Sequence, residues 1–216
     1  MRQTALLSVP DGGLLGSLKA DDRAKLDLLV SALRLRDRDT FAHSRRTARL
    51  SLLLGRELGL NSTELTTLFL GAVLHDVGKI AVPDSVLHKP GRLTDEEWAT
   101  MRRHPDDGRE LLAGLDFLDG AALAVVQHHE RWDGEGYPAG LRGKQIDPLA
   151  RALAVADAFD VMTHHRDYRP ARCSNAEALA ELERCSGTQF DPHAVKVFCR
   201  IARRLPTAGR VSSMTA

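Results

Sequence analysis

Three segments of this chain open with the same helix-start signal, a small polar residue followed three positions later by a glutamate. The pairs are Asn61 with Glu64, Thr94 with Glu97 and Ser174 with Glu177. In such a capping box each side chain accepts a hydrogen bond from the backbone N–H of the other residue, which fixes the first turn of a helix. Apolar residues at helical spacing follow each box, and no convincing set of strands remains. The sequence therefore predicts an all-α fold.

Apolar periodicity also places helices in the rest of the chain. These are expected over 21–36 and 42–58, and at about 105–113, 120–130, 149–164 and 192–204. The stretch 132–147 holds four glycines and Pro138, which predicts a shaped loop. We expect one folded domain over 20–204, a flexible lead over 1–19 and a polar tail over 205–216.

Composition and cysteine usage restrict the kind of partner. The chain has 30 basic and 29 acidic residues, so there is no global field that would attract a nucleic-acid polymer. No run of 18 apolar residues exists, and a membrane span is therefore not expected. Cys173, Cys185 and Cys199 are odd in number and lack metal-ligand spacing, which is typical of a reducing, cytoplasmic environment.

The most informative polar group is His75 with Asp76, at the end of an apolar helix and followed by Gly78 and Lys79. Neighbouring residues on a helix diverge by about 100°, so the histidine and the aspartate can bind one metal while the carboxylate reaches a second. Gly78 allows a close turn, and Lys79 offers a charge to a phosphate. The alternative is a satisfied core histidine, which for a single His-Asp pair is the commoner outcome.

His128 and His129 close another apolar helix and lead into the glycine-rich loop, where they offer two diverging ligands. A solvated helix end, which favours histidine through the dipole, is the alternative. Asp39 and His43 are four residues apart and would share a helix face, as metal ligands or as a surface ion pair. Asp157 lies in an apolar helix and needs a cation or a metal as partner.

Three further residues are weaker candidates when taken alone. Arg166 and Arg169 could hold phosphate oxygens bidentately, although such a pair is more often a solvated face. His104, with Pro105, is expected to end the helix that Thr94 opens and to project inward.

Taken in chain order, these residues and the segments around them resemble the sequence motifs of the HD-GYP family, a branch of the HD superfamily of metal-dependent phosphohydrolases. The resemblance covers the segments 75–79, 87–94, 104–108, 128–138, 155–157 and 187–192. It implies an all-helical HD-superfamily bundle with a glycine-rich GYP loop. The implied activity is hydrolysis of cyclic di-GMP to linear pGpG or to GMP, with a metal-activated water as nucleophile.

Matching motif positions imply the roles of individual residues. The implied metal ligands are His75, Asp76, His104, His128, His129 and Asp157, with His43 and Asp39 serving an additional metal. Asp76 would bridge two ions and act with Lys79 in catalysis. Lys79, Arg166 and Arg169 would contact phosphates, and Tyr137 would help to hold the dinucleotide. Two features depart from the family pattern: the position of Asp39 is a glutamate in members that resemble a three-metal subclass, and the stretch 163–169 holds unusual histidines.

As cofactors the resemblance implies two or three divalent ions, iron or manganese. The predicted ligand is cyclic di-GMP, and a homodimer or a regulatory or diguanylate-cyclase-type protein partner is compatible with the family. Two other functions stay open: hydrolysis of another nucleotide by an HD-type phosphohydrolase, or a receptor that binds a cyclic dinucleotide or a protein without hydrolysing it.

Overall fold

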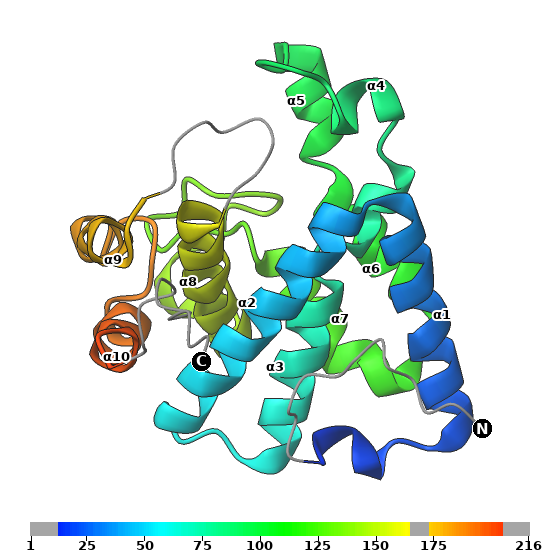
Figure 1. Cartoon of the computed structure of the whole chain (residues 1–216), viewed down its shortest axis with the longest axis horizontal. Helices are drawn as coiled ribbons and strands as arrows, with labels where there is room; N and C mark the ends of the chain where they lie inside the picture. The colour runs from blue at the N-terminus through cyan, green and yellow to red at the C-terminus, as the bar shows by residue number, and fades with distance from the viewer. Residues whose placement is uncertain (1–12, 165–172, 205–216) are drawn as a thin grey trace, which may run out of the picture.

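The computed structural model of the chain describes residues 13–164 and 173–204, and these residues form helices joined by loops (Figure 1). The α-helices are α1 (Ala20–Arg36), α2 (Arg38–Glu57), α3 (Ser62–Leu74), α4 (Asp84–Leu87), α5 (Asp95–Met101), α6 (His104–Leu112), α7 (Asp119–Gln127), α8 (Pro148–Thr163), α9 (Asn175–Arg184) and α10 (Pro192–Ala202). The described residues also form the 3-10 helices η2 (Leu14–Ser17), before α1, and η3 (Val77–Ala81), η4 (Asp116–Leu118) and η5 (Gly143–Gln145), between α-helices. No strand occurs within these two ranges, so the all-α prediction is confirmed.

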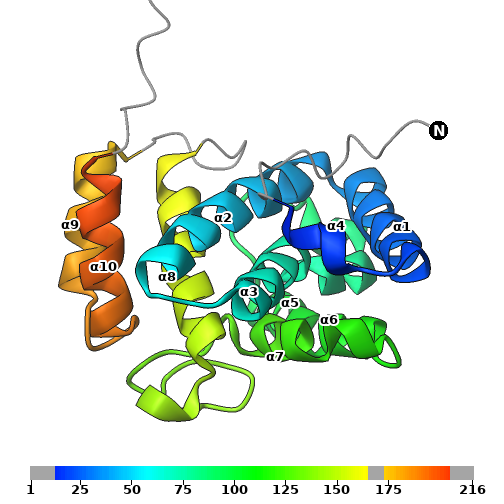
Figure 2. The same ribbon diagram turned by 90° about the horizontal axis from the view of Figure 1, so that it is seen from below.

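The core lies where α2, α3, α7 and α8 pack together, with α1 on one side and the α9–α10 pair on the other (Figures 1 and 2). Helix α3 is central, because every residue from Leu68 to Leu74 is buried. A helix that is apolar on all sides needs neighbours on all sides. The end of α3 therefore delivers the next two residues, His75 and Asp76, into the interior of the bundle.

All three predicted capping boxes are present. At the start of α3, the backbone N–H of Asn61 donates to Glu64 over 2.8 Å, and that of Glu64 donates to Asn61 over 3.0 Å. Thr94 and Ser174 open α5 and α9 in the same way. Local hydrogen bonding thus sets these helix starts, as the sequence indicated.

Two expectations differ from the structure. His104 and Pro105 begin α6 instead of ending the preceding helix, because α5 stops at Met101. Part of the expected flexible lead is ordered, since η2 lies at 14–17 and Leu15 is buried in the core. Among the helices described, none combines the length and the apolar character needed to cross a bilayer.

Candidate metal centre

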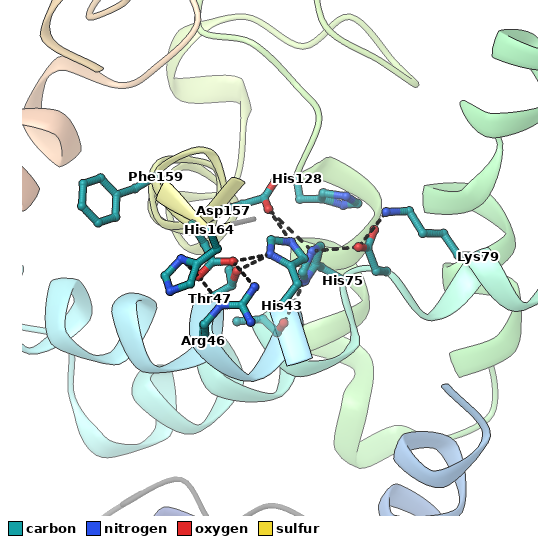
Figure 3. Close-up of polar contacts among 12 residues, drawn as sticks. His43, Arg46, Thr47, His75, Lys79, His128, Asp157, Phe159 and His164 are labelled. Carbon is teal, nitrogen blue, oxygen red and sulfur yellow. Dashed lines mark hydrogen bonds and ion pairs between the residues drawn. The ribbon is translucent and has the colours of Figure 1, made fainter. Parts of the chain in front are cut away.

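Histidine and aspartate side chains from α2, α3, α6, α7 and α8 converge on one interior point. Three overlapping sets of residues can be defined, and within each set the donor atoms lie within 4.8 Å of one another. The sets are His43, His75 and Asp157; His75, Asp76 and His128; and His104, His128 and His129. Figure 3 shows His43, His75 and Asp157 pointing toward one another from three different helices. The residues that were separate candidates in the sequence therefore form a single centre.

Three of the imidazole rings are oriented by backbone carbonyl groups at the ends of the helices that precede them. His75, His104 and His128 each place Nδ1 against the backbone carbonyl oxygen three residues earlier, at 2.8, 2.8 and 2.5 Å. Because a carbonyl oxygen can only accept, Nδ1 carries the proton of each neutral ring and Nε2 is left with a lone pair. A backbone carbonyl in this role is a usual second-shell partner of a metal-binding histidine.

The Nε2 lone pairs of two of these rings point toward each other, an arrangement that a bound cation would stabilise. Nε2 of His104 and Nε2 of His128 are only 3.2 Å apart, and both are acceptors in the tautomers that the carbonyls impose. Oδ1 of Asp157 is buried without a hydrogen bond of normal geometry, although it lies 2.8 Å from Nε2 of His43. Imidazole nitrogens with carboxylate oxygens suit iron, manganese or zinc. The residues present therefore fit divalent metal ions.

Asp76 lies between the two outer sets. Its Oδ2 is 3.4 Å from Nε2 of His75, and its Oδ1 is 3.5 Å from Nε2 of His104. The ammonium of Lys79 lies 2.7 Å from Oδ2 and offsets the buried negative charge. Each oxygen of this carboxylate thus faces a different set, which is the geometry that a bridging ligand requires.

Gly78 makes the approach of Asp76 to His104 possible. A Cβ atom at position 78 would lie 1.9 Å from the carbonyl oxygen of His104 and 2.5 Å from the backbone nitrogen of Gly108. The 3-10 helix η3 and helix α6 therefore touch through their backbones. The sequence indicated a close turn at Gly78, and the structure shows that the constraint is this contact between two elements.

His43 enters the centre from α2 and is 2% exposed. Its Nδ1 lies 2.7 Å from Oδ2 of Asp160, a carboxylate that the sequence analysis missed. Arg46 donates to the same carboxylate from Nε and Nη2, over 2.8 and 2.9 Å. The available signal was a second aspartate three residues after Asp157 in an apolar helix.

The glycine-rich loop after α7 is tied to the centre. Both oxygens of the buried Glu130 accept backbone N–H groups of the loop, from Ala139 at 2.7 Å and from Leu141 at 2.9 Å. The Tyr137 ring stacks on His129 with centroids 4.8 Å apart, and the guanidinium of Arg102 lies over the same ring at 5.3 Å. The predicted shaped loop therefore places Tyr137 at the edge of the metal centre.

One of the remaining predicted residues, Asp39, does not join the centre, and two cannot be placed. Asp39 is exposed in the first turn of α2, and it belongs to none of the three sets found in the described part of the chain. His43 groups instead with His75 and Asp157. Arg166 and Arg169 lie outside the described residues. Beside the centre, Lys79 is partly buried.

Burial controls the protonation of the histidines. It is the main cause that lowers the pKa of His104 to about 4 and that of His129 to about 3. Burial also opposes the charged form of His75, but the carboxylates of Asp76 and Asp157 outweigh it and raise the pKa of that ring. At neutral pH, His104 and His129 are therefore uncharged and able to bind a metal.

We expect the metal-free protein to lose stability as the pH falls from about 6.5 toward about 4, because the unfolded chain takes up protons on these histidines that the fold excludes. This contribution is fully present above the unfolded pKa. Urea unfolding in chelator, at about pH 7 and about pH 5, measures it. His104→Gln should reduce the difference between the two, and an unfolding free energy that does not fall with acidification would contradict the assignment.

Comparison with known proteins agrees with this arrangement. A family model described as the HD domain matches residues 27–194. The cyclic di-GMP phosphodiesterase response regulator RpfG of Xanthomonas campestris pv. campestris is 44% identical over 181 residues, which cover 83% of this chain and 48% of that protein. The 3'3'-cGAMP-specific phosphodiesterase 2 of Vibrio cholerae is 37% identical over 171 residues, which cover 78% of this chain and 33% of that protein.

A solved structure has the same fold. The HDG"Y"P protein Bd1817 from Bdellovibrio bacteriovorus superposes with a TM-score of 0.62 and 26% identity, over 76% of this chain and 52% of that one. The chain belongs to the HD-domain family, in its HD-GYP branch. It spans about half the length of the curated relatives it matches.

Proposed function

We propose that this protein is a metal-dependent phosphodiesterase that hydrolyses cyclic di-GMP to linear pGpG, to GMP or to both. The observation that carries the proposal is the 3.2 Å approach of His104 Nε2 to His128 Nε2, beside the carboxylate of Asp76, in two rings whose Nδ1 atoms contact backbone carbonyl oxygens. Such an approach is favourable only with a cation close by. Relatives named as cyclic di-GMP phosphodiesterases support the choice of substrate.

The donor sets support two ion positions with one shared ligand. His43, His75 and Asp157 form the first position, and His104, His128 and His129 form the second. Asp76 turns one oxygen to each. Bound divalent ions would lower the pKa of a water to roughly 7 and polarise the phosphate oxygens. We propose iron or manganese, and a third ion at Asp39 and His43 stays a prediction.

The protein's own side chains have distinct roles in this proposal. Lys79 holds its ammonium 2.7 Å from Asp76 and offsets the charge that gathers on a phosphate at the centre. Tyr137, fixed by the loop and by its stacking on His129, holds the dinucleotide at the rim. Arg166 and Arg169 stay predicted phosphate contacts. A cytoplasmic location and a homodimer or protein partner also stay predictions.

Removal of metal should abolish turnover. Chelator-treated protein is expected to release no product from cyclic di-GMP, and addition of Mn²⁺ or Fe²⁺ under anaerobic conditions should restore hydrolysis, because the nucleophile and the leaving group both depend on the ions. Product chromatography identifies pGpG and GMP. Equal turnover with and without bound metal would refute the proposal.

A second substrate is favoured by one specific comparison, since a relative is named as a 3'3'-cGAMP-specific phosphodiesterase. The same metal chemistry would serve either cyclic dinucleotide, so only relative rates separate them. A panel of cyclic di-GMP, 3'3'-cGAMP and a guanosine polyphosphate decides the substrate class. Metal-loaded protein that binds a cyclic dinucleotide and releases no product would instead indicate a receptor.

A further inference from the structure

We propose that Asp160 is a positioning residue that fixes the orientation and the tautomer of His43, and that it thereby controls metal occupancy at the position formed by His43, His75 and Asp157. This inference rests on the proposed metal-dependent function. It concerns a side chain that itself lies outside the three donor sets.

The surroundings of Asp160 leave it no direct access to substrate. Its side chain is 0% exposed, on the helix that also carries Asp157. Oδ2 lies 2.7 Å from Nδ1 of His43 and accepts from Nη2 of Arg46 over 2.9 Å. Oδ1 accepts from Nε of Arg46 over 2.8 Å, and Nδ1 of His164 lies 3.0 Å from it. Both oxygens are thus held by polar neighbours inside the protein, and Figure 3 shows Arg46 and His164 gathered beside His43.

This contact determines which nitrogen of His43 is available. An ionised carboxylate only accepts hydrogen bonds, and the bidentate guanidinium of Arg46 favours the ionised form of Asp160. The proton of the neutral His43 ring therefore resides on Nδ1. Nε2 then presents its lone pair to the centre, 2.8 Å from Asp157.

His43 differs in this respect from the other oriented ligands. His75, His104 and His128 are held by carbonyl oxygens three residues earlier in the chain. His43 is held by a residue 117 positions away, on another helix. The His43 ligand of the first ion position therefore depends on the packing of α2 against α8, whereas His104 and His128 of the second position are aimed locally.

Asp160→Asn is the informative substitution, because it keeps the shape and removes the charge. An amide oxygen cannot serve both Arg46 and His43 as the carboxylate does, and an amide NH₂ turned toward His43 would favour the wrong tautomer. Loss of an outer-shell partner lowers metal affinity roughly 10- to 100-fold. We expect a loss of that size at one of the two positions and little change at the other.

The expected loss of affinity can be measured by titrating chelator-treated protein with Co²⁺. Visible absorption and calorimetry report the number of equivalents bound and their affinities. Wild-type protein should bind two equivalents, and Asp160→Asn should bind one with unchanged affinity and one more weakly. Turnover of the variant should return at excess Co²⁺, which a merely structural defect would not allow. Asp191→Asn is the matched control, because Asp191 is another buried carboxylate, paired with Arg151 and capping α10, and it should keep both equivalents.

The outcomes distinguish a failure of the proposed metal-dependent function from a failure of the role of Asp160. Wild-type protein that binds no Co²⁺ overturns the proposed function. Wild-type and Asp160→Asn proteins with the same two affinities overturn this inference alone. If the variant does not fold, ¹⁵N-histidine NMR of Zn²⁺-loaded wild-type protein decides: we expect a protonated Nδ1 and a coordinated Nε2 on His43, and coordination through Nδ1 would refute the role of Asp160.

Discussion

Replacement of Asp76 by alanine should lower kcat on cyclic di-GMP by at least about 10³-fold, since loss of about 4 kcal/mol of metal-dependent transition-state stabilisation corresponds to that factor. Asp76 is the side chain whose two oxygens face both outer donor sets, so its removal would take away the ligand that the two proposed ion positions share. It also leaves the Lys79 ammonium without its buried partner. The measurement is steady-state hydrolysis in metal-replete buffer, with bound metal quantified in the same samples.

Asp106→Ala is the matched control for this variant. Asp106 belongs to α6, as His104 does, but its side chain is 48% exposed and faces Arg109. It should retain wild-type turnover and metal content. Asp76→Ala protein that holds two equivalents of metal and still hydrolyses cyclic di-GMP at the wild-type rate would remove Asp76 from the mechanism.

Gly78→Ala should destabilise the protein by about 3 kcal/mol or more, at the upper end of the usual cost of overpacking. The added methyl group would meet the His104 carbonyl oxygen at 1.9 Å and the Gly108 nitrogen at 2.5 Å, and both are backbone atoms. Relief requires η3 and α6 to separate, which also moves Asp76 away from His104. We expect a lower unfolding midpoint in urea and a weaker affinity for metal.

Gly16→Ala provides the comparison for that variant. No heavy atom lies within 4 Å of a Cβ placed at residue 16, so the same chemical change should alter the unfolding free energy by no more than about 1 kcal/mol. If Gly78→Ala unfolds at the wild-type urea concentration and binds metal normally, the close backbone contact does not govern the site.

Local signals in the sequence predicted much of the fold. A capping box involves residues three apart and depends little on distant packing, and so Asn61, Thr94 and Ser174 open helices as expected. The apolar run before His75 likewise predicted a buried helix that delivers this residue to the interior. The boundary near His104 was wrong because α5 is short and exposed, and periodicity does not mark where it stops.

The parts of the centre that escaped prediction depend on contacts between distant segments. Nothing in the local sequence distinguishes Asp160 from the other aspartate of α8, Asp157. Its partners His43 and Arg46 are 117 and 114 residues away. Asp39 has the right spacing to share a helix face with His43. It is nevertheless exposed, because it lies in the first turn of α2 while His43 is one turn further into the protein.

The hydrogen bonds from His75, His104 and His128 to the carbonyl groups that end the preceding helices also bear on how this protein would acquire metal ions. Rings that the backbone has already aimed lose little conformational entropy when a cation binds, so less of the binding free energy is spent on ordering them. A preformed cage of nitrogen and oxygen donors discriminates weakly among first-row transition metals. If metal binds as proposed, its supply in the surrounding cell, more than the shape of the polypeptide, would then determine which element occupies the site.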